Sequence, residues 1–329
     1  MSLEKSTRSS EAGYVVGVDA GGTSTRALAV DAAGAVLGTG RSGGSNPNSH
    51  PPEEAAGRIA DAITAATAGL DPERVRGCVV GMAGESKLTD PAIAAVFELA
   101  FQRAGVGGLV RVASDAEAAF ASATPAADGT VLIAGTGSIA GRIRKRRMVG
   151  TAGGYGWLLG DEGSGYWIGR EAIRATLDAL CGGQPLAGLP SAVLVEALGS
   201  APSADLSEAE RLHIWSRLIT AANAEPPVRL ARFAPLVSAA DGAGEAAARR
   251  IVDSAAGFLV ANALGCRENG ENTPVVLVGS VLSETSPVGV KVRAALSDLE
   301  VLTSSDGVLG AAWLAAVEAF GEGAVRPVA

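Results

Sequence analysis

Two short glycine-rich segments carry residue types that bind phosphate. The first, Asp19-Ala20-Gly21-Gly22-Thr23, follows an apolar stretch that begins at Tyr14. Its adjacent glycines lack a Cβ, so backbone N–H groups can approach an anion closely, and Thr23 adds a hydroxyl donor. Asp19, at the expected strand end, is placed to hold Mg²⁺ through water. An ordinary tight hairpin is the alternative, because Asp and Gly are common there.

The second segment, Gly135-Thr136-Gly137-Ser138, follows a predicted strand over 131–134 and offers two glycines and two hydroxyls. One such turn is weak evidence for a phosphate site. Two of them at matching positions of a repeated layout are stronger evidence, because a nucleoside triphosphate needs its phosphates bound from both sides.

The elements around these turns follow one order. Three β-rich stretches from Tyr14 onward form a predicted antiparallel meander, with turns at 19–23 and 31–34. We then expect helices over 51–70, 91–104 and 117–123, which alternate with strands over 75–81 and 109–113. The predicted order is therefore βββαβαβα.

After a polar break at 124–129, the chain again reads strand, turn, strand, turn, strand. A helical insertion over about 164–264 follows. We expect this half to close with a strand over 274–278, a helix over 292–296, a strand over 300–302 and a helix over 307–320. We interpret the halves as an internal duplication. The two glycine-rich turns would then face each other across a cleft, where open α/β sheets bind ligands.

Composition narrows the class of protein. Hydrophobic residues make up 47% and charged residues 19%, so the chain has ample apolar surface for a buried core. The net charge of −8 argues against a general polyanion binder. The run from Arg142 to Arg147 is basic, but it falls where the second meander turns. We interpret it as a solvated hairpin rather than a nucleic-acid site.

The spacing of the cysteines and the length of the apolar runs indicate in which cellular compartment the protein works. Cys78, Cys181 and Cys266 occur singly, so neither a disulfide framework nor a Cys-rich metal site is indicated, and a reducing cytoplasm fits best. No apolar run approaches the roughly 20 residues that span a bilayer. Residues 1–13 are polar and lack a signal-peptide core, and we expect them to form a disordered leader.

Several longer motifs match one family. They are GVDAGGTSTRA, SDAEAA, IAGTGSIA, GGYGWLLGDEGSGYWIG, VVLVGSVLSE and the late run from Asp306 to Ala312. With them the chain, from Tyr14 to about Phe320, resembles the N-acetylglucosamine kinase family of the actin-like and sugar-kinase ATPase superfamily. The broad family that the chain resembles also includes ATPases that activate 2-hydroxyacyl-CoA dehydratases and benzoyl-CoA reductases.

The resemblance implies an α/β fold of two lobes, the actin-like or ribonuclease H-like ATPase fold, with the βββαβαβα unit duplicated. The N-terminal lobe would cover 14–124 together with the last helix, about 313–322. The C-terminal lobe would cover 125–312 and hold the helical insertion. It also implies ATP and Mg²⁺ as cofactors. We expect a cytoplasmic homodimer that binds an amino sugar and a nucleotide, with no nucleic-acid or membrane partner.

The resemblance also implies roles for individual residues. The turns 19–23 and 135–138 become two phosphate loops, and Gly279 and Ser280 lie near the adenosine. Asp115, directly after a strand in VASDAEAAF, becomes the catalytic base that accepts the proton of a sugar hydroxyl attacking the γ-phosphate. A helix N-cap is the alternative role for it. Ser114 could cap the helix equally well.

The predicted sugar contacts are Asn46, Thr136, Gly154 and Asp161. Asp161 lies in a glycine- and acid-rich loop over 153–165 that is hard to justify as core, and carboxylates bind several sugar hydroxyls at once. We expect Glu162 to support it. The alternative for both acids is a favourable charge at a helix N-terminus, worth about 0.3 to 1 kcal/mol. Turn formation is the alternative for Asn46.

The predicted function is transfer of the γ-phosphoryl group of ATP to the 6-hydroxyl of N-acetylglucosamine. Glucosamine is a close alternative, because the sequence does not show how the 2-substituent is treated. An alternative of another class is an ATP-hydrolysing activator of a dehydratase or reductase. Such activators bridge an iron–sulfur cluster with cysteines, and no clustered pair occurs in this sequence.

Overall fold

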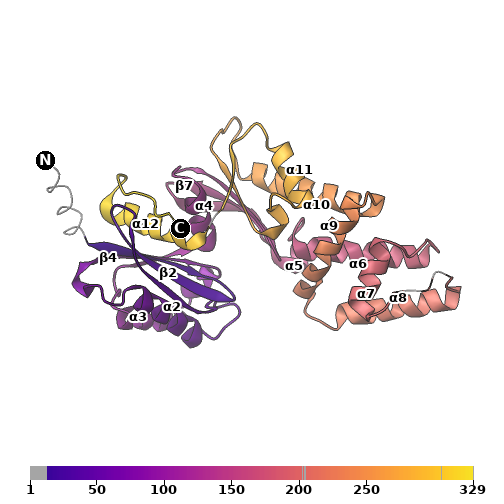
Figure 1. The fold of residues 1–329 in the computed structure, drawn as a ribbon, viewed down its shortest axis with the longest axis horizontal. Coiled ribbons are helices and arrows are strands. Elements are labelled where there is room, and N and C mark those ends of the chain that lie inside the picture. The colour runs from indigo at the N-terminus through magenta and orange to yellow at the C-terminus, as the bar shows by residue number, and fades with distance from the viewer. Residues whose placement is uncertain (1–12, 202, 204, 305, 329) are drawn as a thin grey trace. The chain divides into compact units, whose positions relative to one another are not determined.

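The computed structural model describes residues 13–201, 203, 205–304 and 306–328. The predicted leader, residues 1–13, lies outside the described residues except for Gly13. The chain divides into two compact units (Figure 1). Unit 1 contains the residues up to Gly129, the segment Ile143–Val149 and the residues from Ser304 onward, and unit 2 contains Thr130–Arg142 and Gly150–Thr303.

Unit 1 is built on a five-stranded sheet. Its strands are β1 (Tyr14–Ala20), β2 (Ser24–Asp31), β3 (Val36–Gly43), β4 (Val75–Met82) and β5 (Val110–Ser114), in the order β3-β2-β1-β4-β5. The first three form the predicted antiparallel meander, and β4 and β5 run parallel to β1. The central strand β1 is almost fully buried, as its valine-rich sequence predicts for a strand covered on both faces.

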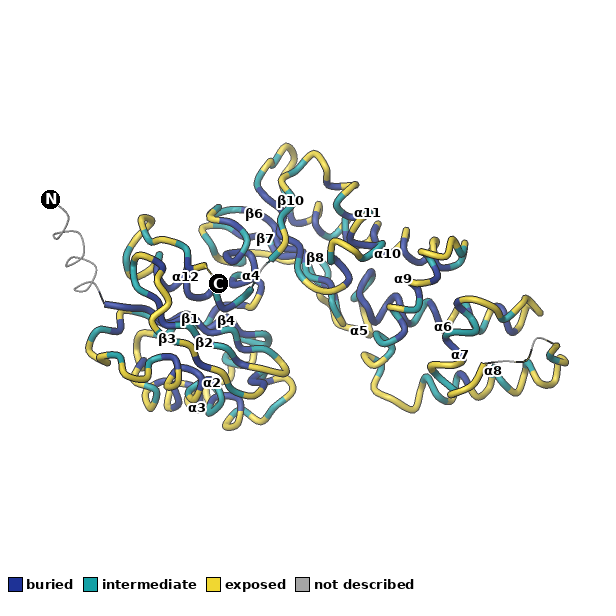
Figure 2. Tube along the Cα trace, in the orientation of Figure 1, coloured by how far each residue is buried: buried dark blue, intermediate teal, exposed yellow. Residues whose placement is uncertain are grey.

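Helices cover both faces of this sheet. On one face lie α2 (Pro52–Ala66) and α3 (Pro91–Arg103), which form a core with Val16 and Val18. On the other face lie α4 (Asp115–Ala123) and the last helix α12 (Gly307–Phe320), which form a second core with Val15 and Val79. Two short 3₁₀ helices flank β4, namely η1 (Pro72–Arg74) and η2 (Glu85–Thr89). Figure 2 shows β1 and β4 as buried segments of this sheet.

The second sheet repeats the first. Its strands are β6 (Gly129–Ala134), β7 (Ser138–Arg144), β8 (Arg147–Gly153), β9 (Val275–Val278) and β10 (Val301–Thr303). Their order, β8-β7-β6-β9-β10, is that of the first sheet, and β9 again runs parallel to both neighbours. The predicted duplication and the α/β fold class are confirmed.

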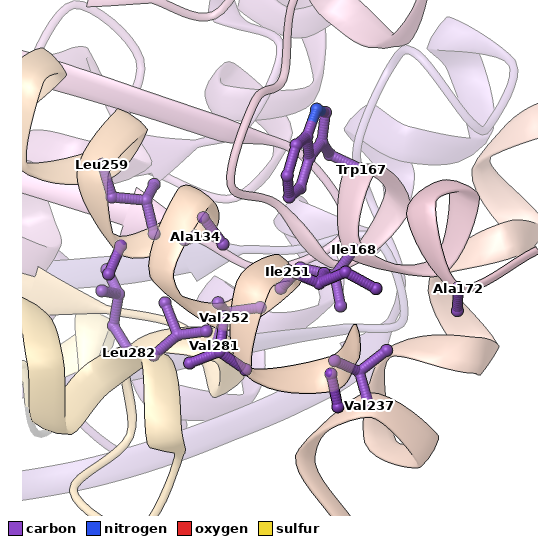
Figure 3. Close-up of a cluster of buried hydrophobic side chains, with 14 of the residues drawn as sticks. Ala134, Trp167, Ile168, Ala172, Val237, Ile251, Val252, Leu259, Val281 and Leu282 are labelled. Atoms are coloured by element: carbon purple, nitrogen blue, oxygen red, sulfur yellow. The ribbon is translucent and has the colours of Figure 1, made fainter. Parts of the chain in front are cut away.

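The helices of unit 2 enclose one large apolar core. They are α5 (Gly156–Leu159), α6 (Gly165–Cys181), α7 (Leu189–Leu198), α8 (Glu208–Asn223), η3 (Pro227–Phe233), α9 (Ala234–Gly242), α10 (Ala246–Gly265), η4 (Ser280–Leu282) and α11 (Pro287–Ala295). Figure 3 shows Ala134 of β6 near Leu259, Val252 and Leu282 in this core. The insertion is thus packed directly on the second sheet. Among the described residues, no helix is long and apolar enough to cross a bilayer.

The basic run forms the predicted hairpin, but it is not simply solvated. Lys145 and Arg146 both have positive φ, as a two-residue type I′ turn requires. Arg146 donates two 2.7 Å hydrogen bonds to Glu322, and its guanidinium lies 5.0 Å from the ring centroid of Trp313. Lys145 and Arg147 are exposed, as expected for a solvated hairpin, whereas Arg146 is held by these partners within unit 1.

Candidate active site

Three parallel strands of unit 1 end at the same level. Ala20 of β1 lies opposite Met82 of β4, and Met82 lies opposite Ser114 of β5. The segments that follow these residues therefore leave the sheet at one edge, the edge at which open α/β sheets bind ligands. Asp115 and the first predicted phosphate loop are both brought to this edge.

The first loop is held by neighbouring segments of unit 1. The Gly21 N–H donates to the Ser24 carbonyl at 3.1 Å, and the Gly21 carbonyl accepts from the Ser45 N–H at 2.8 Å. The Gly22 carbonyl lies 3.0 Å from Nε2 of His50. The N–H groups of Gly22 and Thr23 donate to no acceptor among the described residues, so they are free to bind an anion.

Asp19 is paired with a cation. Its Oδ2 accepts from Nη2 of Arg26 at 2.6 Å, and Nη1 of Arg26 donates to Asp306 at 2.8 Å. Asp306 also caps α12 by accepting from the Val308 N–H. This chain of contacts fixes the Asp19 carboxylate through its Oδ2.

The donor set near Asp19 fits a metal bound together with a nucleotide. Among the described residues, no group of three or more His, Cys, Asp or Glu side chains could hold a metal ion by itself. Mg²⁺ typically uses one or two carboxylates together with phosphate oxygens and water. Asp19 can supply such a carboxylate through Oδ1.

Asn46 takes part in a turn. Its Oδ1 accepts from the Asn48 N–H at 2.8 Å, and its carbonyl accepts from the N–H groups of Ser49 and His50. Turn formation, the alternative weighed for this residue, is therefore present. The Asn46 amide nitrogen is left to act as a donor toward a ligand.

Asp115 does not cap its helix. The hydroxyl of Ser114 accepts from the Glu117 N–H at 3.2 Å, so Ser114 is the N-cap of α4. The Asp115 side chain is exposed in the first turn. Desolvation by neighbouring protein atoms raises the pKa of its carboxyl, and the charge of Asp19 raises it further, while the Ala116 N–H lowers it. A carboxylate with a raised pKa is a better proton acceptor.

The start of α4 is fixed by an ion pair that the sequence analysis missed. Glu117 accepts from Nη1 of Arg111 at 2.7 Å, and its other oxygen accepts from the Met148 N–H at 3.0 Å. Both side chains of the ion pair are largely buried. Glu117 thereby joins β5 and the 143–149 hairpin to the turn that carries Asp115.

In unit 2, the second predicted loop packs on the N-terminus of α6. The N–H groups of Gly165 and Tyr166 donate to the carbonyls of Gly135 and Thr136 at 2.7 and 3.1 Å. The Gly135 N–H donates to the Gly137 carbonyl at 3.0 Å. The N–H groups of Thr136 and Gly137 have no acceptor among the described residues, which leaves two backbone donors for phosphate.

Asp161 lies directly beside this loop. Its Oδ1 accepts from the Ser138 N–H at 3.3 Å, and the Ser138 hydroxyl donates to the Glu162 carbonyl at 2.9 Å. Burial raises the pKa of Asp161, the Ser138 N–H lowers it and the charge of Glu162 raises it. Asp161 has a φ of +57°, in the left-handed region that Asp enters at lower cost than most other residues.

Gly154 and Gly279 also lie next to the second loop. The Gly154 N–H donates to the Ser138 carbonyl at 3.1 Å. Gly279 has a φ of +101°, and a Cβ there would overlap the carbonyl oxygen of Ala134. Unit 2 therefore brings together all the predicted site residues that belong to it.

A cavity of about 460 Å³ opens beside the second loop. Gly135 and Thr136 line one part of it, and Ile168 and Val281 supply apolar surface. Its other polar side chains are all hydroxyls, from Ser238, Ser280, Ser283, Thr285 and Ser286. An apolar cavity with a few hydroxyls beside a phosphate loop suits a nucleoside.

Comparisons with known proteins identify the family of the chain. Residues 16–315 match the profile of the BadF/BadG/BcrA/BcrD ATPase family. The chain belongs to this family. The ATPase is 25% identical to a candidate N-acetylglucosamine kinase from Chromobacterium violaceum, with a TM-score of 0.69 over 92% of this chain and 99% of that one.

Two curated relatives of the ATPase have names that specify a reaction. An N-acetylmuramic acid/N-acetylglucosamine kinase from Clostridium acetobutylicum is 34% identical over 166 residues, which are 50% of this chain and 53% of the relative. A glucosamine kinase from Vibrio cholerae is 32% identical over 174 residues, 52% of this chain and 57% of the relative. The chain spans about half the length of the curated relatives it matches.

Proposed function

We propose that this ATPase is an amino-sugar kinase that transfers the γ-phosphoryl group of ATP to the 6-hydroxyl of N-acetylglucosamine, or of glucosamine. The observation that carries the proposal is the uncapped carboxylate of Asp115 at the sheet edge that also holds the first phosphate loop. The named activities of the curated relatives support the same class of reaction.

In this proposal the residues of unit 1 activate the sugar. Asp115 accepts the proton of the 6-hydroxyl as that oxygen attacks the γ-phosphorus. The N–H groups of Gly22 and Thr23 bind phosphate oxygens, and the amide of Asn46 binds a sugar hydroxyl. Asp19, oriented by Arg26, would hold Mg²⁺ through water, and the bound ion would withdraw charge from the phosphates.

The residues of unit 2 bind the same two substrates. The N–H groups of Thr136 and Gly137 and the hydroxyl of Thr136 bind phosphate. Gly279 and Ser280 flank the cavity that takes the nucleoside. Asp161 accepts hydrogen bonds from sugar hydroxyls, and Thr136 and Gly154 complete the sugar contacts. Ser138 uses its N–H and its hydroxyl within unit 2, so its main role is to orient Asp161.

The test is a coupled ADP-release assay with glucose, glucosamine, N-acetylglucosamine and N-acetylmannosamine, followed by NMR mapping of the product. We expect sugar-dependent ADP release and a phosphate on the 6-oxygen. A phosphate on the 1-oxygen, or ATP turnover that is indifferent to every amino sugar, would contradict the proposal.

A further inference from the structure

Glu85 is a carboxylate of the candidate site that the motifs do not include. It begins η2, three residues after β4 ends at Met82. Since Met82 lies opposite Ser114 in parallel register, Glu85 and Asp115 follow neighbouring strands at the same edge of the sheet. The helix η2 packs against β5, the strand that leads to Asp115.

The residue before Glu85 places this segment against the predicted sugar ligands. Gly84 has a φ of +83°, and a Cβ there would overlap the side-chain amide of Asn48 and lie 2.9 Å from Oδ1 of Asn46. The backbone at Gly84 therefore passes directly against both asparagines. Glu85 therefore directly follows Gly84, the residue that lies against Asn46. It also lies beyond the end of β4, next to the end of β5 that leads into Asp115.

Some of the carboxylates near Glu85 are paired with a cation and others are not. Arg26 compensates Asp19, and Arg111 compensates Glu117. Glu85 and Asp115 have no cationic partner among the described residues. Burial of Glu85 raises its pKa, its own N–H lowers it, and the negative charges of Asp115 and Glu117 raise it again. This edge of the sheet therefore carries two uncompensated carboxylates and favours a cationic ligand.

We propose that Glu85 determines which 2-substituent of the sugar the enzyme accepts. It selects the ammonium group of glucosamine over the acetamide of N-acetylglucosamine. The inference rests on the proposed function and decides between its two substrates. An ammonium forms charge-assisted hydrogen bonds with a carboxylate, whereas an acetamide is neutral and larger. Only the ammonium carries a positive charge that offsets the negative charge of Glu85.

The decisive variant is Glu85→Gln, which keeps the side-chain volume and removes the charge. We expect kcat/KM for glucosamine to fall by about 10-fold to 100-fold, as for loss of a charged hydrogen bond, and kcat/KM for N-acetylglucosamine to stay the same or rise. Glu73→Gln is the matched control, because Glu73 lies exposed in η1 at the opposite end of β4. It should change neither value.

A pH profile gives a second readout. Glucosamine turnover should rise as the carboxyl groups ionise and fall again as the sugar amine loses its proton. N-acetylglucosamine has no such amine, so its profile should lack that alkaline fall. The groups that act on Glu85 are Asp115 and Glu117, with Arg111 paired to Glu117, and Lys87 shares its helix. In Glu85→Gln the two sugars should give the same alkaline behaviour.

The outcomes separate this inference from the proposed function. An active kinase whose preference between the two sugars is unchanged in Glu85→Gln would overturn the role of Glu85. If no amino sugar is phosphorylated, the proposed function fails, and calorimetry of the wild-type protein with each sugar still decides the inference. The same calorimetry applies if Glu85→Gln does not fold. Tighter binding of N-acetylglucosamine than of glucosamine at neutral pH would refute it.

Discussion

At the scale of single residues, the structure distinguishes the helix cap, Ser114, from the candidate catalytic base, Asp115. Ser114 and Asp115 are adjacent, and either could cap α4 from its sequence alone. The hydroxyl of Ser114 takes the capping hydrogen bond, which leaves the Asp115 carboxylate free at the sheet edge. The two residues should therefore fail in different ways when they are replaced.

Asp115→Asn keeps the side-chain volume and removes the proposed base, so kcat should fall by about 10² to 10⁴ while the KM values change little. Ser114→Ala removes the cap, so it should lower the free energy of unfolding by about 0.5 to 2 kcal/mol. Steady-state kinetics and urea unfolding of both variants make the comparison. Near-normal kcat in Asp115→Asn would show that the carboxylate does no chemistry.

Asp115→Asn should also change how the free energy of unfolding depends on pH. Because the folded-state pKa of Asp115 is raised, the native state binds its proton more tightly than the unfolded state does. The carboxyl therefore favours folding below its ordinary pKa, and this contribution is lost as pH rises through the raised value. Asp115→Asn should be more stable than wild type at neutral pH, and the difference should shrink in acid.

At the scale of elements, the sequence predicts the sheets better than it predicts the contacts of the site. The meanders and the repeated strand order follow from alternating and apolar runs between glycine turns, and they are confirmed. Helix ends differ by a few residues, since α2 ends at Ala66 and α4 begins at Asp115. These shifts reflect caps and turns that several residue types can make.

Residues whose partners are distant along the chain could not be recognised from the local sequence pattern. His50 contacts the Gly22 carbonyl, 28 residues away, and the sequence showed only an isolated histidine. Ser238 lines the cavity beside the second loop from within the helical insertion, where nothing in the local pattern marks it. Glu85 follows β4, and its nearness to Asp115 depends on the parallel register of two strands.

One close contact between helices links stability to the site. A Cβ at Gly310 of α12 would overlap the carbonyl oxygen of Ala118 in α4, the helix that begins at Asp115. Gly310→Ala should therefore destabilise the protein by about 1 to 3 kcal/mol, as overpacking does, and should also lower kcat. Gly57→Ala is the matched control.

Gly57 lies in α2 with open space where a Cβ would be, so the alanine there should be neutral or stabilise the protein by up to about 1 kcal/mol. Thermal unfolding and the ADP-release assay measure both effects. Equal stability of the two variants would show that α12 and α4 have room to separate, contrary to the close packing described here.

At the scale of the whole molecule, duplication gives the chain two candidate phosphate loops. One belongs to unit 1 and the other to unit 2, and each has two backbone N–H groups that donate to no acceptor among the described residues. The loops could serve one nucleotide or two. The proposed function requires one, because only one γ-phosphoryl group is transferred to each sugar.

Calorimetry should therefore find one ATP bound per chain, and a variant in either unit should weaken that single site. Thr23→Val removes a hydroxyl donor in unit 1 and should weaken ATP binding by about tenfold, as for one hydrogen bond to a charged group. Gly137→Val should weaken it too. In addition it should impair sugar binding, because a Cβ at Gly137 would lie 3.0 Å from Oδ2 of Asp161. Thr220→Val, an exposed site on α8, is the control and should have no effect. Two ATP molecules per chain, or one loop variant with wild-type affinity, would mean that the loops act on separate ligands and that the duplicated turns are not one phosphate site.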